Sequence, residues 1–125
     1  MPIMGAKAKN VVNLDAGQGE DFDIFLNFKD SNGYAVDITG WKLSLTIKDK
    51  ISKPDSSAAF QLDVTTHADA LNGVSGFHLP HLSTKDLDGI YQYDIQAVAP
   101  GNQIKTIMRG TFRFDYAITQ RNSLV

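Results

Sequence analysis

Three histidines are the first residues whose side chains could do chemistry. His78 and His81 lie three positions apart, separated by Leu79 and Pro80, and His67 lies upstream. Short histidine spacings occur in zinc sites. Pro80, however, interrupts the helix that would aim both rings at one ion, and no second pair of ligands matches them. We therefore expect surface-loop histidines, no metal and no cofactor.

Acidic residues gather just before the first long alternating segment, at Asp15, Glu20, Asp21 and Asp23. Two carboxylates can act as general acid and base only when their separation and their pKa values are controlled. Closeness in sequence ensures neither condition. A solvated loop is the favoured interpretation of this cluster, and weak cation binding is the alternative.

A second acidic segment resembles the start of a calcium loop. It runs Asp30-Ser31-Asn32-Gly33. An EF-hand loop needs glycine at its sixth position and glutamate at its twelfth, where this chain has Ala35 and Trp41. Asx-turn hydrogen bonding explains the four residues without a metal.

No nucleophile motif is present. The segment Val74-Ser75-Gly76 lacks the flanking glycine of a nucleophile elbow, and no phosphate loop or dinucleotide fingerprint occurs. Trp41, Tyr91, Phe112 and Phe114 could stack on sugars or bases, but aromatic residues at alternating positions are more often core. We therefore expect no enzymatic activity.

The composition limits the partners. The chain has 125 residues, which suits one domain, and its 12 basic and 14 acidic residues give a formal charge of -2. We expect no nucleic-acid partner, because such a surface needs a basic stripe. Cysteine is absent, which excludes disulfides and thiolate ligands. No apolar run approaches the roughly 20 residues of a membrane span, so we expect no membrane partner and no secretory leader.

Alternating apolar residues must position whatever functional groups exist. A period of two places every second side chain on one face of a strand. The pattern, with turn signals between the segments, predicts an all-β, Ig-like antiparallel β-sandwich of about seven to eight strands. The expected core is Phe22, Ile24, Leu26, Phe28, Trp41, Leu43, Leu45, Ile47, Phe60, Leu62, Val64, Tyr91, Tyr93, Ile95, Phe112 and Phe114.

The last long strand should continue this alternation through Ile104, Thr106 and Met108, with a bulge or bend at Gly110. The expected turn and corner residues are Asp30, Asn32, Gly33, Asp37, Thr39, Gly40, Asn72, Gly73 and Gly89. We expect an arm over residues 1–9, the sandwich over 10–117 and a tail over 118–125. Phe25 points away from the inward set, and the candidate interface residues are Phe25, Lys7, Lys9 and Arg121.

Three stretches together carry a resemblance to a known group of proteins. They are Phe28 to Gly33 with Val36-Asp37-Ile38-Thr39-Gly40-Trp41, then Leu71-Asn72-Gly73-Val74 with Phe77-His78-Leu79, and then Gly89-Ile90-Tyr91-Gln92-Tyr93-Asp94-Ile95-Gln96. Their order resembles small Ig-like β-sandwich proteins of tailed bacteriophages. It is similar to the N-terminal domain of upper baseplate and tail-fibre-attachment proteins and to related virion accessory proteins.

This resemblance implies a non-enzymatic virion structural protein, assembled in the host cytoplasm. Its expected partners are other virion proteins and further copies of itself in a symmetric assembly. A tail, baseplate, neck or fibre-anchoring accessory subunit is the favoured role. A capsid decoration protein, or a module that binds carbohydrate or the host surface, is the alternative.

Overall fold

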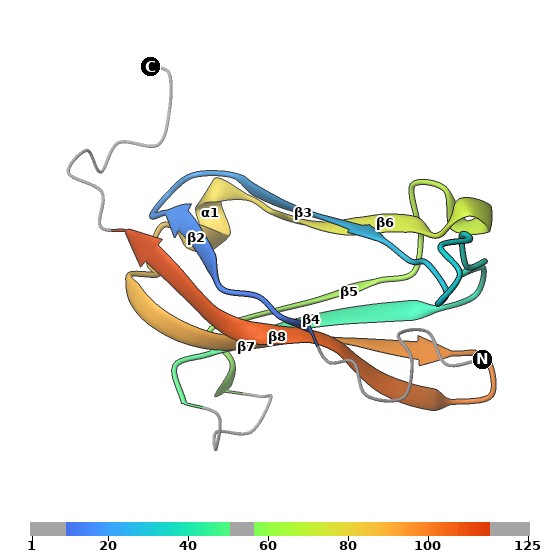
Figure 1. Cartoon of the computed structure of the whole chain (residues 1–125). Coiled ribbons are helices and arrows are strands. Elements are labelled where there is room, and N and C mark those ends of the chain that lie inside the picture. The colour runs from blue at the N-terminus through green and yellow to red at the C-terminus, as the bar shows by residue number, and fades with distance from the viewer. Residues whose placement is uncertain (1–9, 51–56, 116–125) are drawn as a thin grey trace.

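The computed structural model describes residues 10–50 and 57–115, and these form two layers of β-strands (Figure 1). The expected arm and tail lie outside the described residues, as do Lys7, Lys9 and Arg121. The strands are β1 Asn10–Val11, β2 Leu14–Gly17, β3 Phe22–Asn27, β4 Lys42–Lys48, β5 Phe60–Val64, β6 Val74–Leu79, β7 Gly89–Ala99 and β8 Gln103–Asp115. A 3-10 turn, η2, covers Ala70–Asn72, and the short helix α1 covers His81–Thr84.

The larger sheet has the strand order β1-β8-β7-β4-β5, with β2 also paired to β8, and the smaller sheet consists of β3 and β6. The predicted all-β fold with two sheets is confirmed. The main strand pairs are antiparallel, as predicted, and β1 and β2 add two short parallel pairings to β8. Alternation predicts which face a side chain occupies but not the direction of a neighbouring strand.

The pairing of the N-terminal segment with β8 is interrupted where the chain crosses Gly110. β1 pairs with Met108 and Arg109, β2 begins its pairing at Phe112, and Val12 passes over the gap between them. A Cβ atom on Gly110 would lie 2.2 Å from the Val12 carbonyl oxygen. Gly110 therefore permits this close approach of two backbones, and the bulge of β8 lies elsewhere.

Inward side chains of both sheets fill the space between the layers. The buried core residues of the small sheet are Ile24, Leu26, Phe77 and Leu79, and those of the large sheet include Leu43, Leu45, Ile47, Tyr93, Ile95, Ala97, Phe112 and Phe114. Phe28 and Trp41 are buried beside them, and Phe22, Phe60, Leu62, Val64 and Tyr91 are partly buried against this cluster. Each large apolar side chain that is fully buried contributes about 1.5–3 kcal/mol to folding.

A bulge changes the phase of β8. Ile95 pairs with Met108, but the next residue of β7 pairs with Thr106, so Ile107 is the extra residue of β8. Ile107 is buried, whereas Ile104 is 62% exposed. The predicted continuous alternation from Ile104 to Met108 is therefore wrong, because one inserted residue exchanges the two faces of a strand.

Carboxylates close the turns that follow β3. Asp30 Oδ1 accepts hydrogen bonds from the backbone N–H groups of Asn32 and Tyr34, at 2.9 and 3.0 Å. Asp37 Oδ1 accepts bonds from the Thr39 hydroxyl and N–H, at 2.6 and 2.9 Å. The Thr39 hydroxyl, and then the Thr39 N–H, lower the pKa of Asp37. The four glycines predicted to lie in turns all have positive φ; they are Gly33, Gly40, Gly73 and Gly89.

Leu45→Asp should prevent folding, because it places a carboxylate in the centre of the core, where Leu45 is fully buried opposite Ile95. The control is Gln96→Asp on the outer face, which should leave a folded protein. Circular dichroism during heating measures both outcomes. A soluble Leu45→Asp protein with a cooperative thermal transition would contradict the assignment of the inner face.

Candidate functional site

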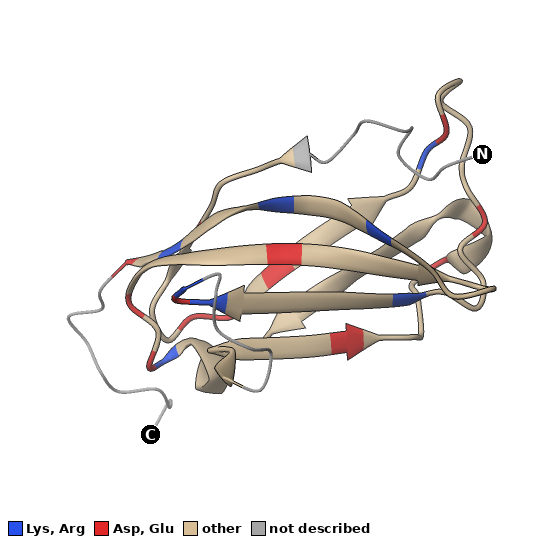
Figure 2. Cartoon of the chain, turned by 90° about the horizontal axis from the view of Figure 1, so that it is seen from below, with Lys and Arg blue, Asp and Glu red and all other residues tan. Residues whose placement is uncertain are grey.

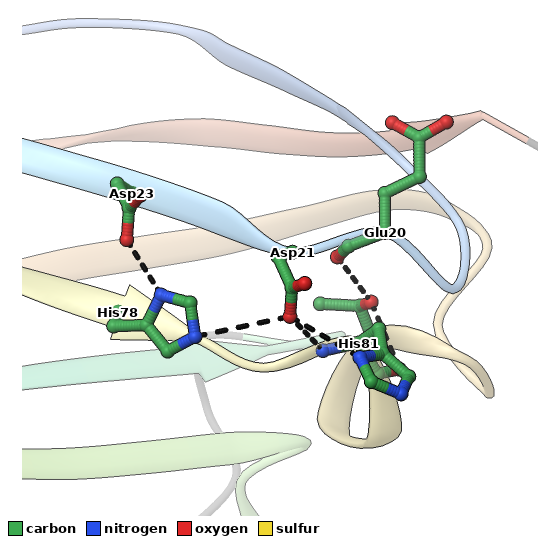
Figure 3. Close-up of polar contacts among 6 residues, drawn as sticks. Glu20, Asp21, Asp23, His78 and His81 are labelled. Atoms are coloured by element: carbon green, nitrogen blue, oxygen red, sulfur yellow. Dashed lines mark hydrogen bonds and ion pairs between the residues drawn. The ribbon is translucent and has the colours of Figure 1, made fainter. Parts of the chain in front are cut away.

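Antiparallel pairing of β3 with β6 brings the histidines and the acidic residues together (Figure 3). Asp23 lies directly opposite His78, and His78 Nδ1 is 2.6 Å from Asp23 Oδ1. Asp21 Oδ1 lies 3.8 Å from His78 Nε2 and 3.3 Å from His81 Nδ1. We call Asp21, Asp23, His78 and His81 the His–Asp cluster.

The same carboxylate holds the short helix α1. Asp21 Oδ1 accepts the backbone N–H of His81 at 2.7 Å, and the Thr84 hydroxyl donates to the carbonyl of Glu20 at 2.8 Å. The N–H of His81 is the main cause of the lowered pKa of Asp21, and the imidazole of His81 lowers it further. The helix α1 therefore begins at His81 and is held by a residue 60 positions away in the chain.

The His–Asp cluster is a surface feature. The side chains of Asp21, Asp23 and His78 are each more than half exposed, and that of His81 is 38% exposed. Each imidazole faces a carboxylate. Within residues 10–50 and 57–115, no group of three histidine or acidic side chains is arranged to hold a metal ion. The arrangement supports a clamp that joins the start of β3 to the segment after β6.

His67 lies in the loop between β5 and η2, as predicted, but its side chain is partly buried and bonded on both sides. Its Nε2 lies 2.9 Å from the Trp41 carbonyl oxygen and its Nδ1 lies 2.8 Å from the Ser75 hydroxyl. The carbonyl can only accept, so Nε2 carries a hydrogen, and in the neutral ring Nδ1 accepts from Ser75. Trp41 precedes β4 and Ser75 lies on β6, so His67 bridges the two layers.

A serine bonded to a histidine is also the pair from which nucleophilic catalysis starts. Ser75 retains only 4% of its surface, on the inward face of β6 next to Phe77. The geometry therefore supports a structural role. The sequence contains a signal for the bond between Ser75 and His67, because a polar residue at an inward position of a strand requires a hydrogen-bond partner.

The outer face of the large sheet carries a hollow of about 500 Å³. Figure 2 shows this face from below, with charges of both signs scattered over it. We call this feature the sheet hollow. Its lining is Val11, Asn13, Thr46, Lys48, Gln92, Tyr93, Asp94, Gln96, Arg109, Gly110 and Thr111. The sequence indicated only Tyr93, as a core residue, and Gly110, as a bulge or bend, because the hollow is created by the pairing of four strands.

Tyr93 anchors the wall that the N-terminal crossing with Val11 and Asn13 forms beside the hollow, although its own ring points inward against Phe112. Its hydroxyl donates to the Val12 carbonyl at 2.7 Å and holds the N-terminal crossing against the sheet. Burial raises the pKa of Tyr93 to about 12, so the hydroxyl keeps its proton at physiological pH. The wall is therefore held by a neutral hydrogen bond.

Comparisons with known proteins leave the family open. No family model matches the sequence, and no curated protein matches it. Among solved structures, the fold is similar to the PmoD soluble domain from Methylocystis sp. ATCC 49242 (Rockwell). The two share 12% identity at a TM-score of 0.48, over 82% of this chain and 76% of that one, and a likeness at this level supports no functional argument.

The described residues contain no helix of the length and apolar character that crossing a membrane requires.

His67→Phe should destabilise the fold, because the Ser75 hydroxyl and the Trp41 carbonyl lose their buried partner, at about 1–3 kcal/mol for each group. Urea unfolding of the wild type, His67→Phe, Ser75→Ala and the double variant gives the coupling free energy. Ser31→Ala, at an exposed turn, is the control. A coupling free energy near zero would show that the bridge does not form.

Asp21 should stabilise the fold only when it is ionised. Because its folded pKa lies below its ordinary value of 3.8, its contribution is present above about pH 4 and is lost as the pH falls through the folded pKa. The melting temperatures of the wild type and Asp21→Asn should therefore differ at pH 6 and converge toward pH 2.5. Asp15→Asn, on β2, is the matched control. A difference that stays constant down to pH 2.5 would contradict the clamp.

Proposed function

We propose that the chain is a non-catalytic assembly module and serves as a structural subunit of a tailed-bacteriophage virion. The observation that carries the assembly role is Phe25, which is 81% exposed on the outer face of the small sheet. The bacteriophage setting is supported by the motif resemblance. Tail, baseplate, neck and fibre anchor are the positions that this resemblance favours.

The surroundings of Phe25 leave its ring uncovered. Gly76 lies directly opposite on β6, and a Cβ there would lie 2.3 Å from the Ile24 carbonyl oxygen. Only glycine fits, so β6 supplies no side chain directly opposite the ring. Covering an exposed phenylalanine with a partner contributes about 1.5–3 kcal/mol. The outer face of the small sheet is therefore a favourable contact surface for another protein.

Open strand edges offer a second kind of contact. Within the described residues, β3 and β6 pair only with each other, and β5 pairs only with β4. An unpaired edge presents backbone donors and acceptors that a strand from a neighbouring subunit can satisfy. Repeating one such contact by symmetry closes a ring or other oligomer. Other virion proteins and copies of this chain are the partners that we propose, with assembly in the host cytoplasm.

The alternatives differ in which surface they use. A capsid decoration protein would use the same assembly surface. A stacking platform for sugars built on Trp41, Phe112 or Phe114 is not supported, since all three rings are buried. Tyr91, its fourth member, is half-buried. Carbohydrate binding has a separate observation in its favour, the polar sheet hollow, which is argued below.

Phe25→Ser should weaken self-association about tenfold or more, because the partner loses the contact with the ring. Sedimentation velocity across a concentration series measures the association constant. Ile104→Ser is the control, since Ile104 is 62% exposed but belongs to the other sheet. A wild-type protein that stays monomeric at all concentrations would contradict self-assembly.

The virion setting has its own test. Mass spectrometry of purified particles produced in cells that express the chain should find it at a fixed ratio to the other virion proteins, and Phe25→Ser should reduce that ratio. Particles that lack the chain would contradict the setting and leave the sedimentation result as a separate finding.

A further inference from the structure

We propose that the sheet hollow binds an acidic oligosaccharide, that is, a sugar chain carrying carboxylate or sulfate groups. The proposal concerns the outer face of the large sheet and goes beyond the assembly role of the small sheet. It depends on the shape of the hollow, on the types of its side chains and on its charge.

The hollow runs across the strands. Register pairing places Val11, Arg109, Asp94 and Thr46 in one row across β1, β8, β7 and β4. Neighbouring strands are about 4.8 Å apart, so four strands span roughly 14 Å. A volume of about 500 Å³ lies within the range of small-ligand sites. The shape suits a short chain molecule lying across the sheet.

Amide and hydroxyl side chains dominate the lining. Gln92 and Gln96 carry amides with donors and an acceptor, and the Asn13 amide keeps its amino group as a donor. The Thr111 hydroxyl donates to Asn13 and can still accept, and the Thr46 hydroxyl accepts from Gln61 Nε2 and can still donate. Sugar hydroxyls also donate and accept, so a lining of this kind can satisfy them in both directions. An apolar ligand would instead leave these groups without partners, which is costly once water is displaced.

Part of the lining is already held in place. Asn13 Oδ1 accepts bonds from the N–H and the hydroxyl of Thr111, at 3.1 and 3.0 Å. These bonds fix the orientation of the amide and leave its amino group as the part that can meet a ligand. The Tyr93 bond to Val12 holds the same wall. Side chains fixed on paired strands lose little freedom on binding.

The charge of the lining favours an acidic sugar over a neutral one, even with the Asp94 carboxylate directly opposite Arg109. Lys48 and Arg109 are basic and Asp94 is the one acidic residue, so the lining carries an excess of one positive charge. The guanidinium of arginine matches a carboxylate with two parallel hydrogen bonds. Tyr93, the one aromatic residue of the lining, is 4% exposed and cannot stack against a neutral sugar ring.

An acidic peptide fits this place less well. Extended peptides bind by adding a strand to an open edge. The floor of the hollow lies over β8, β7 and β4, whose backbone groups are already paired with neighbours on both sides. A sugar chain needs no such edge, because it is held by side chains alone.

The test begins with an array of uronic-acid, sialylated, sulfated and neutral glycans probed with the full chain. Binding should be confined to acidic members. Trigalacturonic acid, maltotriose and hexaglutamate are then titrated into isotopically labelled protein, and the side-chain amide signals of Asn13, Gln92 and Gln96 are followed by NMR. Trigalacturonic acid should shift these signals, and the other two probes should not.

Arg109→Ala should weaken binding of trigalacturonic acid about tenfold or more, because it removes the charge-assisted bonds. Arg113→Ala is the matched control: Arg113 lies on the same face of β8 outside the hollow, with its Nε 2.9 Å from Asp115 Oδ1. Phe25→Ser should leave binding unchanged, so this test and the assembly test fail independently. An array without acidic ligands, equal losses for the two arginine variants, or equal shifts with maltotriose or hexaglutamate would overturn the proposal.

Discussion

The structure depends on contacts between aromatic rings that join the two layers. Phe22 on β3 meets Phe112 on β8 edge to face, with ring centroids 5.3 Å apart, and Phe28 meets Trp41 in the same way at 5.7 Å. A sheet of two strands has little backbone pairing of its own and is stable only against another layer. These ring contacts attach the small sheet to the large one. The hydrogen bonds of His67 to Trp41 and Ser75 then fix the position of the two layers relative to each other.

Because the inner faces are filled in this way, function is left to the outer faces. The two outer faces differ in chemistry. The small sheet presents a phenylalanine opposite a glycine, whereas the large sheet presents amides, hydroxyls and a few charges around a hollow. The first suits contact with a protein surface and the second suits a hydrated, polar ligand. The assembly contact and the ligand site that we propose therefore lie on opposite faces of the protein.

The sequence predicts the faces of the strands but not their pairing. Alternation places Leu45, Ile95 and Phe112 inward, and all three are fully buried. It does not predict that β1 and β2 run parallel to β8, because side chains alternate in the same way in parallel and antiparallel strands. It also misses the bulge at Ile107, since one extra residue in a strand is visible only against its partner.

The candidate sites depend even more on pairing. Asp23 and His78 are 55 positions apart, and Arg109 and Asn13 are farther apart still. No local motif could connect residues so far apart. From the sequence, the histidines and the acidic residues therefore look like two unrelated groups, although they form one His–Asp cluster in the structure. The sheet hollow gives no local signal either. The exception is Ser75, whose inward position between apolar neighbours already required a partner. A polar residue at an inward position of an alternating strand can therefore be recognised from the sequence alone. A surface site assembled across four strands cannot.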